Sequence, residues 1–252
     1  MWRHRAAPCS RRTCGRTSRC KSRLSGPAPA RDHDHTEALW AGPGSGKLYF
    51  TRVSCDLHRV DLCVADLATG ESKPLIQERM NVYIETKPVR VTSAGELIWW
   101  SERDGWGHYY LYDGAGTLKN QITNGEFVAE DVSWVDEEGR ALYLTASGHE
   151  DGENPYNMHF YRANLDGSGM KLLDAGNGSH AVNMADSGRF FVDTGSRVDR
   201  APKSALYDAQ GGMAMPLETV DTAPLTAARL QVSGALHRES RRWRNRSLRR
   251  DV

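Results

Sequence analysis

Four segments of the chain follow one plan, and this internal repeat limits the possible folds more than any other feature of the sequence. Each segment has an apolar strand, a turn rich in Asp, Asn and Gly, and a second short strand: residues 62–76, 108–123, 159–174 and 203–218. The turns begin at Asp66, Asp113, Asn164 and Asp208, which are spaced 47, 51 and 44 residues apart. A period of roughly 40 to 50 residues is typical of propeller blades.

Between these hairpins lie further short segments rich in aromatic and β-branched residues, as strands are. The clearest four are residues 47–53, 96–102, 141–147 and 189–195. Each follows a turn of small and acidic residues that suits a tight hairpin: residues 44–46, 93–95, 136–139 and 186–188. One repeat therefore holds four strands, the content of one blade. No apolar period of helical type persists, so the sequence predicts an all-β fold, a partial β-propeller of three to four four-stranded blades.

The number of repeats is small for a closed ring. A closed propeller has about four to eight blades, and an open arc leaves strand edges and part of the core exposed. We therefore expect the chain to be a piece of a larger protein. Its expected parts are a basic low-complexity segment at residues 1–45, a propeller segment at residues 46–221 and an Arg-rich segment at residues 222–252.

The charges divide the chain in a similar way. Residues 1–31 carry nine Lys or Arg and no acid, and residues 229–252 carry eight Arg against two acids. Because the whole chain has 33 bases and 32 acids, residues 32–228 have a net charge of −14. Basic ends can be disordered tails, nucleic-acid arms, or GC-rich DNA translated out of frame. Since the body is acidic, we expect disordered or out-of-frame ends and no nucleic-acid partner.

Membrane and export signals are missing from the sequence as written. There is no run of about 18 apolar residues, which predicts no membrane span. The basic residues near the N-terminus have no apolar segment behind them, which predicts no signal peptide and leaves the compartment open. Of the five cysteines, Cys55 and Cys63 lie in the body. They are either a disulfide across a hairpin or, as we expect, two half-buried strand cysteines.

The most distinctive motif is SERDGWGHYYLYD, residues 101–113, which follows Ile98, Trp99 and Trp100. It resembles the N-terminal propeller of the dipeptidyl peptidase IV branch (S9B) of the prolyl oligopeptidase family. In that family, a strand ending in Trp-x-Ser-Glu leads through a Gly-aromatic turn and a His into an outer strand of Tyr and Leu. The likeness extends from residue 47 to residue 218. The residues that carry the family motif, in a structural role, are Trp100, Ser101, Glu102, Gly105, Trp106, His108, Tyr110 and Tyr112.

The physical chemistry of this motif also favours a structural role. Its aromatic residues alternate along two antiparallel strands, so one set is expected to fill the wedge between blades while the other borders solvent. Residues 102–105 are expected to form a charged hairpin tip. His108 opens the returning strand, where we expect its ring to bond the backbone of that turn rather than to act in catalysis or bind metal.

The resemblance implies that the propeller stands over an α/β-hydrolase domain, restricts entry to short peptides and shapes their cavity. A hydrolase of this kind carries Gly-x-Ser-x-Gly followed by Asp and His, and the 252 residues contain no Gly-x-Ser-x-Gly. We therefore predict no catalytic, cofactor-binding or metal-binding residue, no cofactor, and no peptidase activity for the chain alone. The implied partners are the hydrolase domain in cis and, for the intact enzyme, peptides. The alternative is a stand-alone or oligomeric propeller that acts as a protein-interaction module.

Three other segments suggest chemistry at first sight. Residues 41–49 approach a P-loop, but Leu48 stands where Ser or Thr is needed and a strand is expected instead of a helix. The run Asp32, His33, Asp34 and His35 lacks a framework for zinc, so a solvated linker is expected. The acidic residues 148–155 lack the ligand spacing of an EF-hand, so we expect a solvated loop between strands.

Overall fold

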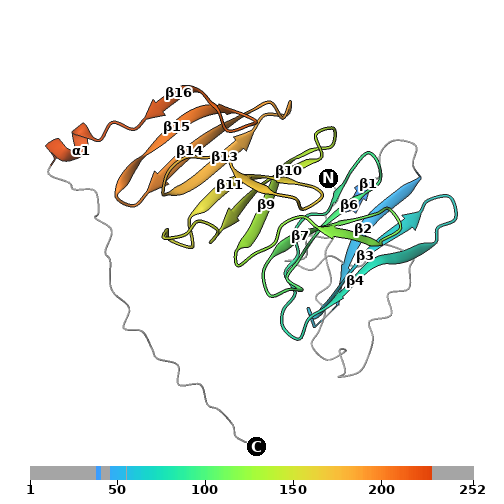
Figure 1. The fold of residues 1–252 in the computed structure, drawn as a ribbon. Helices are drawn as coiled ribbons and strands as arrows, with labels where there is room; N and C mark the ends of the chain where they lie inside the picture. Colours follow the sequence, from blue (N-terminus) through green and yellow to red (C-terminus); the bar gives the residue numbers. More distant parts are fainter. Residues whose placement is uncertain (1–37, 41–45, 55, 229–252) are drawn as a thin grey trace, which may run out of the picture. The chain divides into compact units, whose positions relative to one another are not determined.

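The computed structural model describes residues 38–40, 46–54 and 56–228, and these residues form four antiparallel four-stranded sheets in chain order (Figure 1). The first sheet holds β1 (Ala38–Trp40), β2 (Lys47–Val53), β3 (Arg59–Asp66) and β4 (Ser72–Arg79), and the second holds β5 (Arg90–Val91), β6 (Leu97–Ser101), β7 (His108–Tyr112) and β8 (Leu118–Gln121). The third holds β9 (Val128–Asp136), β10 (Ala141–Ser147), β11 (Met158–Asn164) and β12 (Met170–Leu172), and the fourth holds β13 (Ser179–Met184), β14 (Phe190–Arg197), β15 (Arg200–Asp208) and β16 (Met213–Thr219).

The all-β prediction and the propeller-like blades are confirmed. Strands β2 and β10 have the predicted bounds, while β6 and β14 differ from them by one or two residues at an end. Within each sheet, neighbouring strands are consecutive in the chain, which is the up-and-down order of a blade. The one helix among the described residues is the short α1 (Ala223–Ala227), and no helix of the described residues is long and apolar enough to cross a membrane.

Two compact units share the chain. The first is Met1–Leu144 with Ala163–Met170, and the second is Thr145–Arg162 with Lys171–Val252. The division runs through the third sheet, because the hairpin after β11 packs with the first unit.

The outer turns of the second and third sheets pack on the sheet before them, and the turn of the third sheet accounts for this division. Gly116, between β7 and β8, has φ 88°, and a Cβ there would lie 2.5 Å from the Leu75 carbonyl oxygen of β4. Gly167, between β11 and β12, has φ 77°, and a Cβ there would lie 2.4 Å from the Gln121 carbonyl oxygen of β8. Both positions need glycine for the left-handed backbone and for the close approach. One sheet's outer turn thus packs on the previous sheet's last strand, a contact repeated along the chain.

The first unit has its core around β6 and β7, whose ten residues are all buried. On one face Trp99 and Tyr110 join a cluster with Tyr49 and Leu62 of the first sheet. On the other face the Trp100 indole donates to the Ala129 carbonyl at 2.7 Å. The expectation that one aromatic set borders solvent is therefore wrong, because both faces of these middle strands are covered.

Three further sequence predictions concern the two cysteines of the body, the P-loop-like segment and the run from Asp32 to His35, and each falls partly or wholly outside the described residues. Cys63 of β3 is a buried free cysteine, while Cys55 lies outside the described residues. Residues 41–45 of the P-loop-like segment also lie outside them, and strand β2 begins at Lys47, where a P-loop would begin a helix. The run from Asp32 to His35 lies outside the described residues as well.

Candidate functional site

The motif hairpin between β6 and β7 presents a charged tip in the first unit. Ser101 ends β6, and its hydroxyl accepts hydrogen bonds from the Arg103 backbone NH at 3.2 Å and from Arg103 Nε at 3.0 Å. The Arg103 guanidinium lies 4.3 Å from the centre of the Tyr110 ring and pairs with Glu78. The tip residue Trp106 is 41% exposed. Arg103 therefore fixes the tip against β4 and β7.

The other motif residues have structural surroundings. Trp100, Tyr110 and Tyr112 are buried in the strands, and Gly105 has the left-handed φ of 97° at the turn. Burial, and then the nearby Glu85, raise the pKa of the Glu102 carboxyl. A cavity of about 260 Å³ lies beside the tip, lined by Gln77, Glu78, Arg79, Met80, Arg103 and Tyr112. The structural role predicted for the motif stays a prediction.

His108, the first residue of β7, is fully buried and has both ring nitrogens bonded. Nδ1 lies 3.1 Å from Thr123 Oγ1, and Nε2 lies 3.0 Å from the Gly125 carbonyl oxygen. The ring also meets Phe127 edge-on at 4.9 Å between centroids. The bond to backbone is thus made to the loop after β8, and the expected bond to the hairpin tip is wrong. The His108 ring therefore points to the loop after β8 and not to the hairpin tip.

A second buried histidine stands at the same place in the third sheet. His159, near the start of β11, has Nδ1 2.9 Å from Asp174 Oδ1 and Nε2 3.2 Å from Glu153 Oε2. The other oxygen of Asp174 accepts the Phe160 backbone NH at 2.5 Å. The side chain of Asp174 is fully buried, in the loop after β12. The loop of residues 148–155, expected to be solvated, therefore supplies a carboxylate to a buried group.

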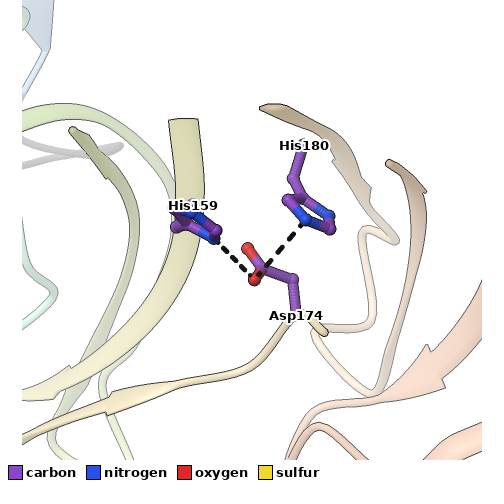
Figure 2. Close-up of side chains that lie close together, drawn as sticks. All are labelled: His159, Asp174 and His180. Carbon is purple, nitrogen blue, oxygen red and sulfur yellow. Dashed lines mark hydrogen bonds and ion pairs between the residues drawn. The ribbon is translucent and has the colours of Figure 1, made fainter. Parts of the chain in front are cut away.

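His180 of β13 completes the cluster in the second unit, and Figure 2 shows how the three side chains converge. Its Nε2 lies 3.9 Å from Asp174 Oδ1 and 3.0 Å from the Gly176 carbonyl oxygen. Its Nδ1 lies 2.8 Å from Asp193 Oδ2 of β14. The rings of His159 and His180 are 5.2 Å apart between centroids. Across the sheet His180 faces Gly195, where a Cβ would lie 2.9 Å from the ring.

The partners decide the charge of both rings. Carboxylate and carbonyl oxygens only accept hydrogen bonds, so a ring with acceptors at both nitrogens carries two protons. The hydrogen bond to Asp174 raises the pKa of His159. Burial lowers the pKa of His180, but the hydrogen bonds to Asp193 and the Gly176 carbonyl outweigh burial and raise it to about 9. The cluster, without other ligands, is a buried ion-pair network.

This arrangement does not fit nucleophilic catalysis. A general base must present a free nitrogen lone pair to a hydroxyl or thiol. In His159 and His180 both ring nitrogens face carboxylate or carbonyl oxygens, and among the described residues these nitrogens have no hydrogen bond to a serine or cysteine. His159, Asp174 and His180 are instead the one group of described residues that could hold a metal ion, with one ligand atom from each, all within 4.8 Å of one another.

This cluster was not predicted from the sequence. Its three residues are 15 and 6 positions apart, which matches no metal-binding motif. Glu153 and Asp193 come from two further segments, so no short pattern contains the group. A signal was nevertheless present: the second and third repeats both begin with His, and a polar residue follows 15 positions later in each, Thr123 and Asp174.

Comparison with known proteins gives a family and a fold. The model of the dipeptidyl peptidase IV (DPP IV) N-terminal region matches residues 13–202. The crystal structure of Porphyromonas gingivalis dipeptidyl peptidase 4 is similar with a TM-score of 0.62 and 18% identity, over 73% of this chain and 26% of that one. A protein assigned as a dipeptidyl aminopeptidase IV from Bacteroides ovatus is similar with a TM-score of 0.62 and 20% identity, over 74% and 29%. The chain thus spans little more than a quarter of either structure.

Proposed function

Because the chain belongs to the dipeptidyl peptidase IV N-terminal region family, we propose that it is a non-catalytic propeller segment of a serine peptidase of that type. Intact relatives carry a hydrolase domain, and the catalytic domain is not covered by this chain. In the proposed role, the blades cover the active site of that domain, admit short peptides and line part of their cavity. The segment alone has no peptidase activity.

The observation that carries this proposal is the repeated sheet with its family motif. The family match includes the hairpin of β6 and β7, whose aromatic residues bind the second sheet to its neighbours in the first unit. The packing of outer turns on the previous sheet, seen at Gly116 and Gly167, is a scaffold contact that involves no reacting group. The sequence contains no nucleophile elbow. Each feature supports a scaffold role.

The first experiment is to sequence the genomic locus and read all three frames on both sides of residues 46–221. Further blades on one side and a Gly-x-Ser-x-Gly hydrolase on the other would support the proposal. Their absence would overturn it and favour the stand-alone module. Purified full-length chain is also assayed with a panel of chromogenic dipeptide substrates. We expect no turnover above buffer, and turnover abolished by a serine-directed inhibitor would contradict the proposal.

The alternative, an oligomeric interaction module, has one observation in its favour. The edge strand β16 is exposed along its whole length and presents the apolar side chains of Met213, Met215 and Leu217, 63%, 50% and 47% exposed. Unpaired edges of this kind are places where another chain can add. Light scattering of the full chain tests this alternative. A concentration-dependent oligomer that becomes monomeric in Met215→Lys would support the module, and a monomer at all concentrations would not.

A further inference from the structure

The cluster of His159, Asp174 and His180 has the donor set of a transition-metal site. Two imidazole nitrogens and one carboxylate oxygen are ligands that Zn²⁺ accepts. We propose that these three side chains bind one Zn²⁺ ion through His159 Nδ1, His180 Nε2 and Asp174 Oδ1 (Figure 2). The site belongs to the second unit of the propeller segment and is independent of the proposed peptidase role.

The distances between the donor atoms fit a single ion. With bonds of about 2.0–2.2 Å, ligand atoms around a tetrahedral zinc lie roughly 3.3–3.6 Å apart. Asp174 Oδ1 is 2.9 Å from His159 Nδ1 and 3.9 Å from His180 Nε2, values on either side of that range. All three donors lie within 4.8 Å of one another. To bind the ion, the side chains rotate and His180 Nε2 exchanges its hydrogen bond to the Gly176 carbonyl for the metal.

The groups behind the ligands are those that support metal-binding histidines. Such a histidine almost always donates its second ring N–H to a carboxylate, a carbonyl or water. Here Nε2 of His159 faces Glu153 at 3.2 Å, and Nδ1 of His180 faces Asp193 at 2.8 Å. The second oxygen of Asp174 is held by the Phe160 backbone NH. All three ligands are thus oriented by groups that the ion does not need.

The charge of the cluster also suits a divalent ion. The carboxylates of Glu153, Asp174 and Asp193 surround the two rings. Imidazole binds metal in its neutral form. The positive charge of Zn²⁺ then compensates the carboxylates, as buried charges require.

A cavity borders the site on one side. A cavity of about 230 Å³ in the second unit is lined by Gly176, His180, Asp193 and Gly195 among others. One oxygen of Asp193, Oδ1, is buried and accepts no hydrogen bond among the described residues. A metal site needs both an orienting shell and a path by which the ion arrives. The cavity reaches the cluster at His180, which is the side from which an ion would arrive.

The test is metal binding by the full-length chain after treatment with EDTA. We expect Zn²⁺ to bind by titration calorimetry at one strong site and to raise the unfolding temperature. Co²⁺ is expected to give the visible absorption of a tetrahedral ion with nitrogen ligands. The double variant His159→Gln/His180→Gln should weaken Zn²⁺ binding by at least about 100-fold, since two of three ligands are lost. Asp193→Asn should weaken it by about 10- to 100-fold while keeping one site.

Two control variants locate the ion. His58→Gln changes an exposed histidine in the first unit and should leave the affinity unchanged. His33→Gln/His35→Gln removes the histidines of the acidic run near the N-terminus and should also leave it unchanged. Loss of strong binding in that second control would overturn the proposal. So would a wild-type chain that binds Zn²⁺ no more tightly than His159→Gln/His180→Gln, a result that does not depend on how well the variant folds.

Discussion

The second and third sheets each bury a histidine at the start of the third strand, but the two histidines have different partners. His108 and His159 are 51 residues apart, and so are the residues that face their Nδ1 atoms, Thr123 and Asp174. In both sheets the facing side chain also accepts the backbone NH that follows the histidine. The pattern of hydrogen bonds is thus repeated, but the facing group is a hydroxyl in the second sheet and a carboxylate in the third.

The difference follows from the side chain that faces Nδ1 of each histidine, which is Thr123 in one sheet and Asp174 in the other. The Thr123 hydroxyl can donate to Nδ1 of His108, and Nε2–H can donate to the Gly125 carbonyl, so a neutral ring satisfies every bond. The Asp174 carboxylate only accepts, so Nδ1 of His159 keeps its proton. Ala129 lies in β9 of the third sheet, and the position 51 residues later, in β13 of the fourth sheet, holds His180. The histidine–threonine pair of the second sheet thus corresponds to a histidine–aspartate pair in the third, which His180 of the fourth sheet joins.

The largest expected effect comes from removing the carboxylate at the centre of the charged cluster. Asp174→Ala removes the hydrogen-bond acceptor of His159 and the negative charge 3.9 Å from His180. Breaking a buried ion pair from one side costs about 3–5 kcal/mol. We expect the free energy of unfolding to fall by that amount in urea denaturation with EDTA present. Asp174→Asn, which keeps the shape, should lose less. A loss no greater than that of Thr123→Ala would contradict the comparison.

Thr123→Ala makes the matching change in the neutral pair. It leaves Nδ1 of His108 and the Tyr109 backbone NH without this partner. Leaving buried polar groups unsatisfied costs about 1–3 kcal/mol. Urea denaturation of this variant under the same conditions gives the difference between the two sheets. Thr123→Ser, which keeps the hydroxyl, is the control and should retain most of the stability.

Tyr109→Phe makes the second sheet resemble the third, because Phe160 occupies the same place 51 residues later. The change removes the hydrogen bond from the Tyr109 hydroxyl to the Glu130 carbonyl, 2.6 Å long, and keeps the ring. We expect a loss of about 1 kcal/mol, the net worth of one such bond. Phe160→Tyr is the reverse exchange, and it should cost at least as much because Phe160 is fully buried. If Phe160→Tyr increased the free energy of unfolding, this result would contradict the correspondence between positions 109 and 160.

The smallest effect concerns Glu96, which lies just before β6 and forms ion pairs with Lys119 and Arg140. Hydrogen bonds first from Arg140, and then from Lys119, lower the pKa of Glu96 below its usual 4.5. A carboxyl group whose pKa is lower in the folded than in the unfolded chain stabilises the fold at pH values above its unfolded-state pKa. That stabilisation is lost as the pH falls through the folded-state pKa. Because Arg140 and Lys119 are nearly half exposed, we expect about 1 kcal/mol or less. Unfolding free energies from pH 6 to pH 3 should fall less steeply in Glu96→Gln than in wild type.

The sequence by itself determined the all-β class and most strand positions. Its repeat of about 47 residues placed four hairpins. Its turns of small and acidic residues placed the four strands that precede these hairpins, because turn residues act locally. The motif around Trp100 and His108 also predicted the family. These properties depend on neighbours within a few positions, and so they can be read along the chain.

Only the tertiary structure decided what covers each strand and which polar groups meet. A period of two separates the faces of β6 and β7 but does not tell whether solvent lies on either face, and here both are buried. The cluster draws His159, Asp174, His180 and Asp193 from different strands and a loop, whose meeting depends on sheet register and packing. The repeat showed that His159 and Asp174 correspond to His108 and Thr123. It did not show that His180 approaches the same carboxylate, because that contact is made through space between two sheets.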